Sequence, residues 1–311
     1  TEEGLRELHR FKDAPILMTT RQANQRGEDS ADQFNARKLL EVSKELRKPI
    51  LPIRAAYTTP EEHPDINVQE MAADDFRGLR HSMDLCEGAR VLLTANQWVE
   101  AGLMNGALGT VRGFMFPSDF DLRSSDKSKN GPIYVIVEFD DVNLGLDEKG
   151  QPRTFFPGDE EKRRWIPVRR QEAWSAVEEG VSRRQFPLTL AWAMTHWKAQ
   201  GMTLRRARVL LGDSTASQAG IGFVAVSRVK HPWHLMFESD LPEYEAFEKA
   251  KWTEGFRSRM RYSLRMEAKA SRTLRRYGFC ALDRWTAEEA ALAEELLKHV
   301  RAEGDLQRSA V

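Results

Sequence analysis

The apolar residues of this 311-residue chain fall into short runs, and this grouping limits the possible folds more than any other feature. Runs of four to eight apolar residues bounded by Gly, Pro or polar residues are typical of buried strands. No run approaches the roughly 20 residues that a membrane-spanning helix requires. The sequence therefore predicts a strand-containing protein that does not cross a membrane. The expected strands span 14–19, 90–95, 132–139, 188–192, 208–211 and 234–238.

Two segments, 31–47 and 219–230, are expected to be helices; the first has apolar residues at loosely helical spacing, and the second is an apolar stretch with a polar Ser-Arg near its end. The second helix lies among the strand signals between 188 and 238. Strands that alternate with a helix over so short a stretch predict a layered α/β core. The strands at 14–19 and 90–95 are candidates for the same sheet.

A different pattern lies between Gly106 and Arg184, where short strands alternate with Gly-rich turns and long loops. This pattern predicts a small β-barrel inserted into the α/β core. Within it, the polar stretch 118–131 predicts a loop. Before it, the segment 48–70 is rich in Pro, Glu and Asp, so we expect an irregular surface segment there.

The C-terminal part of the chain is locally basic. The whole chain balances 47 Lys and Arg against 47 Asp and Glu, whereas residues 249–276 hold ten basic and two acidic residues with aromatic residues among them. Both a solvated amphipathic helix packed on the core and a nucleic-acid contact fit this segment. A further helix is expected to begin at Thr286, because Glu289 completes a capping-box pattern.

The two cysteines, Cys86 and Cys280, lie far apart in the sequence. They suggest neither a disulfide framework nor a zinc site, and they fit a reducing compartment. No metal site is predicted. Because the first residue is Thr1 rather than Met, we expect the chain to be a piece of a longer protein.

The stretch AWAMTHWKAQGMTL places charged and polar residues directly after an apolar run. Lys198 can pair with a phosphate, Trp197 offers a face for base stacking, and Gln200 can reach a base, a sugar or a nucleotide. Gly201 lets backbone N–H groups approach a ligand closely. The alternative is that Trp197 packs in the core and Lys198 is a solvated charge. The hydroxyl groups that can bind a phosphate here belong to Thr195 and Thr203.

A second candidate is Arg228, near the end of the apolar stretch FVAVSRVK at 223–230. One interpretation is a C-terminal cation that interacts with the helix dipole, worth about 0.3–1 kcal/mol. The other is an arginine that stabilises charge on a transferring γ-phosphoryl group, for which the planar, permanently charged guanidinium is suited.

Taken together and in order, these stretches resemble the C-terminal half of the Pif/RecD-like DNA helicases, a branch of helicase superfamily one. The matching pieces are LCEGARVLLTANQWVEAGLMNGALGTVRGF (85–114), PLTLAWAMTHWKAQGMTL (187–204) and FVAVSRVK (223–230). The second is similar to the family's motif V and the third to its motif VI. The stretch 16–40 is similar, more weakly, to the segment near motif IV. The resemblance covers about residues 14–240.

The resemblance implies an α/β fold, a RecA-like second helicase domain of the P-loop NTPase type. Its first part would span 14–105 and its second part 185–240. Residues 106–184 would be an inserted small β-barrel of the Src-homology type, and 241–311 a basic helical tail.

The resemblance also implies roles for single residues. Arg228 would contact the ATP γ-phosphate, and Gln200 and Gly201 would lie at the nucleotide cleft. Arg21 would be the motif IV arginine. The residues expected near single-stranded DNA are Thr195, His196, Trp197, Lys198 and Thr203.

Two departures from the family pattern stand out. Trp197 occupies the place where motif V usually has His, and no G-x-x-x-x-G-K-[ST] motif occurs anywhere in the chain. ATP and Mg²⁺ would therefore be bound mainly by a missing N-terminal half, and we expect this chain alone to hydrolyse no ATP.

Three functions remain open at this point. The chain is one half of a monomeric ATP-dependent 5′–3′ DNA helicase, a single-stranded nucleic-acid binding module, or an inactive helicase remnant. For the helicase we expect a nuclear or mitochondrial location in a eukaryote and a cytoplasmic one otherwise.

Overall fold

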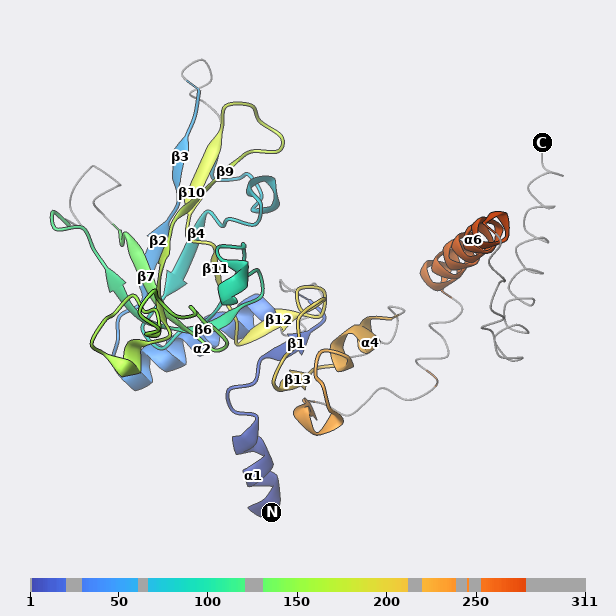
Figure 1. Cartoon of the computed structure of the whole chain (residues 1–311), viewed down its shortest axis with the longest axis horizontal. Helices are drawn as coiled ribbons and strands as arrows, with labels where there is room; N and C mark the ends of the chain where they lie inside the picture. Colours follow the sequence, from blue (N-terminus) through green and yellow to red (C-terminus); the bar gives the residue numbers. More distant parts are fainter. Residues whose placement is uncertain are drawn as a thin grey trace. The chain divides into compact units, whose positions relative to one another are not determined.

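The computed structural model describes residues 2–20, 30–60, 67–120, 131–211, 220–238, 245 and 253–277 (Figure 1). The chain divides into two compact units. One unit comprises Thr1–Leu210 with Val224–Glu238, and the other comprises Leu211–Phe223 with Ser239–Val311. All the strands described below lie in the first unit, which begins with the short helix α1 (Glu2–Arg10).

A four-stranded sheet has the order β12-β1-β13-β14, and each of its pairs is parallel. All three residues of β1 are buried, as expected where both faces of a parallel sheet are covered. The strands predicted at 14–19, 208–211 and 234–238 are confirmed. The strands of this parallel sheet are β12 (Ala193–Thr195), β1 (Ile16–Met18), β13 (Ala207–Val209) and β14 (Leu235–Phe237).

The helix predicted at 31–47 is confirmed as α2 (Ala31–Leu46). It begins with a capping box, in which the Ser30 side chain accepts a hydrogen bond from the Gln33 N–H at 3.2 Å. Its buried Asn35 side chain donates to the Ala193 carbonyl and accepts from the Ala193 N–H, both at 2.8 Å. These two bonds attach α2 to the outer edge of β12.

A five-stranded antiparallel sheet has the order β11-β5-β6-β7-β8. Each strand contributes a side chain that is no more than 2% exposed, namely Leu188, Val91, Val111, Val137 and Val168. The strand predicted at 90–95 therefore belongs here and not to the parallel sheet. The strand predicted at 188–192 is confirmed as the shorter β11, and β12 follows it as a separate strand. The strands of this antiparallel sheet are β11 (Leu188–Leu190), β5 (Arg90–Leu93), β6 (Leu108–Met115), β7 (Tyr134–Phe139) and β8 (Trp165–Arg169).

The segment expected to be irregular at 48–70 contains two strands, so that prediction is wrong for part of its length. β2 pairs with β4, and β3 pairs with β10, which also pairs with β9. The strands are β2 (Leu51–Arg54), β3 (Ala56–Thr58), β4 (Ser82–Leu85), β9 (Gln171–Trp174) and β10 (Ser182–Gln185).

The fully buried Arg183 of β10 holds the chain segment that follows β3. Its guanidinium donates to the carbonyls of Leu79 and Met71, each at 2.9 Å, and of Val68 at 3.1 Å. The same group lies 4.0 Å from the centre of the Phe76 ring. Hydrogen bonds to several carbonyls allow a buried cation to keep its charge.

The remaining elements are short or lie near the C-terminus. The helix predicted at 219–230 is shorter, because α4 (Ile221–Val226) ends before Ser227. Most of the loop predicted at 118–131 and the helix expected at Thr286 lie outside the described residues. In the described part of the chain, no helix is both long and apolar enough to span a membrane. The other elements are η1 (Asp74–Phe76), η2 (Val99–Ala101), η3 (Glu160–Lys162), η4 (Pro232–His234) and α6 (Glu254–Arg276).

Candidate functional site

The motif V stretch forms a compact turn where β12 ends, at the carboxyl end of a parallel strand. The Lys198 N–H donates to the Thr195 hydroxyl at 3.2 Å, and the Gln200 N–H donates to the Trp197 carbonyl at 3.1 Å. Gly201 has a φ of +82°, yet a Cβ there would have no neighbour within 4 Å. A glycine is therefore favoured here by the left-handed backbone conformation and not by lack of space.

Most of the predicted contact residues lie on the surface of this turn. Trp197 is 50% exposed, which excludes the alternative that it packs in the core. Thr195 is half-buried. The residues that share the exposed side are Trp197, Lys198, Gln200, Gly201 and Thr203.

His196 is the exception, because its side chain is fully buried. Its N–H donates to the Met18 carbonyl at 3.0 Å. Burial lowers the pKa of His196 to about 4, and the nearby backbone of Leu210 opposes this shift only in part, without good hydrogen-bond geometry to either ring nitrogen. The residue is therefore a neutral packing residue at neutral pH. The prediction that His196 contacts DNA does not fit this position.

Arg228 lies against the turn, although the two are well separated in the sequence. The Leu204 N–H donates to the Arg228 carbonyl at 2.7 Å, and the Arg228 Nη1 lies 3.5 Å from the Met202 carbonyl. Its Nε and Nη2 donate, each at 2.7 Å, to the Val224 carbonyl and the Ser227 hydroxyl. Since a guanidinium has five N–H groups, this half-buried side chain keeps two for an anion.

A loop that precedes β6 also contacts the turn, and its residues were not among the predicted site residues. The Lys198 Nζ donates to the Asn105 side-chain oxygen at 3.4 Å, and the Asn105 N–H donates to the Asn96 side-chain oxygen at 2.8 Å. A Cβ on Gly106 would lie 3.2 Å from Met202. Asn96 and Asn105 therefore join the candidate site.

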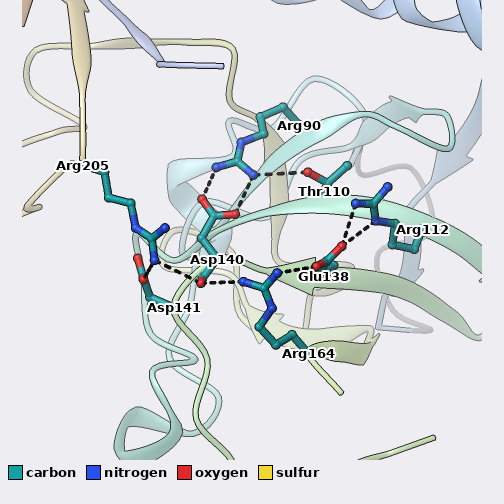
Figure 2. Close-up of polar contacts among 8 residues, drawn as sticks. All are labelled: Arg90, Thr110, Arg112, Glu138, Asp140, Asp141, Arg164 and Arg205. Carbon is teal, nitrogen blue, oxygen red and sulfur yellow. Dashed lines mark hydrogen bonds and ion pairs between the residues drawn. The ribbon is translucent and has the colours of Figure 1, made fainter. Parts of the chain in front are cut away.

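Ion pairs anchor the segment that follows the turn. Arg205 pairs with Asp141, just beyond the end of β7 (Figure 2). The neighbouring Asp140 accepts from Arg90 through both carboxylate oxygens, and its carbonyl accepts from Arg164 at 3.1 Å. The antiparallel sheet thus holds the end of the turn through charged side chains. The remaining members of this network are Thr110, Arg112 and Glu138.

Two further predictions concern ligands. Arg21, the motif IV candidate, lies outside the described residues. Within the described ranges, no group of three or more His, Cys, Asp or Glu side chains is arranged to hold a metal ion.

The comparison with curated proteins finds Pif1 helicases. The chain is 33% identical to the ATP-dependent DNA helicase PIF1 of Danio rerio over 151 residues, which are 48% of this chain and 18% of that protein. The human PIF1 is 33% identical over 147 residues, 46% of this chain and 17% of that protein. The Pif1 of Psychrobacter sp. is 30% identical over 165 residues, 48% of this chain and 25% of that protein. No protein-family model matches the chain.

Among solved structures, the Pif1 helicase of Candida albicans is 24% identical and covers 76% of this chain and 49% of its own, with a TM-score of 0.48. The Bacteroides Pif1 bound to single-stranded DNA is 22% identical and covers 82% of this chain and 51% of its own, with a TM-score of 0.40. Because these TM-scores are low, the assignment depends on the sequence matches. The chain is thus a relative of the Pif1 ATP-dependent DNA helicases over about half of its own length, and the match spans about a fifth of theirs.

Proposed function

We propose that this chain is the C-terminal portion of an ATP-dependent 5′–3′ DNA helicase that moves along single-stranded DNA. In the proposal, Thr195, Trp197, Lys198 and Thr203 contact the strand. Gln200, Gly201 and Arg228 face the nucleotide, together with Arg21. ATP and Mg²⁺ would be held mainly by a P-loop domain outside this chain. Because the match covers only part of the relatives, their activity is a proposal for this chain.

One observation carries the proposal. The turn that follows β12 and the Arg228 segment are joined by the Leu204–Arg228 hydrogen bond of 2.7 Å. This bond would hold the residues proposed to contact DNA close to the arginine proposed to contact a phosphate. Such a short connection supports the proposal, because coupling of ATP hydrolysis to strand movement requires that movement at one site reaches the other.

The domain organisation follows the same proposal. The parallel sheet would belong to the RecA-like domain, made of 14–105 and 185–240, and 241–311 would be the basic helical tail. The inserted barrel at 106–184 would contribute β6, β7 and β8 to the antiparallel sheet. The other two strands of that sheet, β5 and β11, come from the segments that flank the insertion.

Binding of single-stranded DNA tests the strand-contacting residues. We expect the chain to bind a fluorescent oligothymidine, and Trp197→Ala to weaken binding roughly 5- to 150-fold, because a stacked base is worth about 1–3 kcal/mol. Lys198→Ala should also weaken binding. Trp174→Ala is the matched control, since Trp174 is 60% exposed on β9; Lys149→Ala is the control for Lys198. Unchanged affinity in both turn variants would contradict the proposal.

ATP hydrolysis tests the role of Arg228. We expect the chain alone to show background hydrolysis, and a mixture with the separately expressed P-loop domain of a Pif1 relative to show hydrolysis stimulated by single-stranded DNA. Arg228→Ala should lower that rate by about 10³-fold or more if the arginine stabilises the transferring phosphoryl group. Rapid turnover by the chain alone would show that its nucleotide site is complete and would contradict the assignment.

A further inference from the structure

A row of basic residues runs along α6, a helix that the proposed motor site does not use. Among the residues whose side chains are described, the row comprises Arg257, Arg261, Arg265, Lys269 and Arg276. At about 100° per residue, these positions fall within about 120° of the helix circumference. They extend over about 29 Å of the helix axis, with most neighbours about 6 Å apart. We call this row the basic face.

The basic face lies on a stable, amphipathic helix. Thr253 caps its start, where the hydroxyl accepts a hydrogen bond from the Phe256 N–H at 3.3 Å. The apolar positions Phe256, Met260 and Leu264 are partly buried and occupy the stripe of the helix that borders the basic face at Arg257. Arg257 and Arg261 are partly buried, and the outward part of the basic face consists of the exposed Arg265, Lys269 and Arg276.

Several of these cations are open to an outside partner. Arg265, Lys269 and Arg276 are exposed and form no ion pair among the described residues. Arg261 pairs with Glu254 at 2.8 Å, at the start of the helix. The partner that complements such a face is a polyanion with closely spaced negative charges.

We propose that the basic face of α6 binds the phosphate backbone of double-stranded DNA without reading its sequence. A duplex presents one negative charge per roughly 1.7 Å of its axis, so each exposed cation of the face would have a phosphate within reach. A helix about 10–12 Å wide also fits a major groove about 12 Å wide.

A single strand is a poorer partner for this face. Single-strand sites combine cations with aromatic side chains on which successive bases stack. Only Tyr262, which is 67% exposed, borders the basic face among the described residues. The proposal concerns a surface of the second unit and does not depend on the proposed helicase activity.

The test measures binding of the full 311-residue chain to a blunt-ended duplex of about two helical turns, at a series of salt concentrations. The variant Arg265→Gln/Lys269→Gln/Arg276→Gln removes three cations and keeps strong helix formers. We expect the slope of log K against log salt to become shallower by about 2.7, because each lost phosphate contact contributes about 0.9. The control Lys12→Gln/Lys149→Gln/Arg169→Gln makes the same change in net charge on exposed residues elsewhere.

The outcomes separate the possibilities. A shallower slope in the α6 variant alone, with unchanged helical circular dichroism, supports the proposal. Equal slopes in the two variants, or no duplex binding by the wild-type chain, would overturn it. The proposal would also be overturned if the α6 variant lost binding to phosphatidylserine vesicles but kept duplex binding. That result would assign the basic face to a membrane surface. Trp197→Ala should leave duplex binding intact, so failure of the helicase proposal would be visible separately.

Discussion

The two larger sheets of the first unit differ in how their charged side chains are placed. In the antiparallel sheet, Arg90 and Arg164 contact the carboxylates of Asp140 and Glu138 within the chain. Beside the parallel sheet, Trp197, Lys198 and Gln200 are exposed on a short turn. Arginines with internal carboxylate partners hold the fold together, and exposed groups on a rigid turn are the better candidates for ligand contact.

Two fully buried polar residues also differ from each other: Arg183 lies on β10 in the three-stranded sheet, and His196 directly follows β12 of the parallel sheet. Arg183 keeps its charge because carbonyl oxygens surround it. His196 lies at the start of the candidate turn and stays neutral because burial lowers its pKa. The predictions below test whether these groups are structural, from the largest expected effect to the smallest.

Arg183→Leu should produce the largest loss of stability. The substitution leaves several carbonyls without their donor, and we expect the free energy of unfolding to fall by about 3–5 kcal/mol. Urea denaturation measures this value. The neighbouring Arg184 is exposed on the same strand, so Arg184→Leu should change stability by no more than about 0.5 kcal/mol. Similar losses in the two variants would show that the carbonyl contacts of Arg183 contribute little.

His196 should make stability depend on pH. Its pKa is about 4 in the folded chain, compared with the ordinary histidine value of 6.5. Between these values the unfolded chain binds a proton that the folded chain does not, so stability is lost as the pH falls from 6.5 towards 4. The loss should reach about 3 kcal/mol.

Urea denaturation of wild-type and His196→Leu chains across this pH range measures the effect of His196 as a difference. The unfolding free energy of His196→Leu should depend less on pH than that of the wild-type chain. His9→Leu, at an exposed position, is the control and should keep the wild-type pH dependence. Equal pH dependence in the wild-type chain and the His196→Leu variant would contradict the buried, neutral state.

The ion pairs of Figure 2 should differ with exposure. The Arg90 and Asp140 side chains are 17% and 29% exposed, whereas Arg205 and Asp141 are 73% and 71% exposed. We expect Arg90→Met to cost about 1–2 kcal/mol of unfolding free energy and Arg205→Met less than about 1 kcal/mol, because water screens the outer pair. Urea denaturation of the two variants in low and high salt measures these losses. A larger loss of unfolding free energy in Arg205→Met than in Arg90→Met would contradict the expected effect of exposure.

The sequence predicted those parts of the fold that depend on local signals. β1 and β7 were predicted from their short apolar runs, and α2 was predicted from apolar residues at loosely helical spacing. The pairing of β5 with β11 was not predictable from the sequence. The two strands lie far apart in the chain, and other strands of similar composition could have paired with β5 equally well. β2 was missed because Pro52 lies within it, and proline is accepted only at the edge of a sheet.

The candidate site was predictable in part. The order of residues indicated the turn, and the structure places Trp197 and Lys198 at its surface. The contact between Lys198 and Asn105 joins residues 93 positions apart, so no local pattern could indicate it. The burial of His196 was missed because, in a sequence, a polar residue beside Trp197 and Lys198 cannot be told from these exposed residues.

The paired bonds from Asn35 to Ala193 have a consequence for association with other molecules. β12 is the outer strand of its sheet, and an outer strand normally offers its backbone to any extended peptide. At Ala193 the amide of Asn35 already occupies both backbone groups, as a neighbouring strand would. This border of the sheet is therefore closed at that point to strand addition by another chain, immediately before the segment expected to meet DNA.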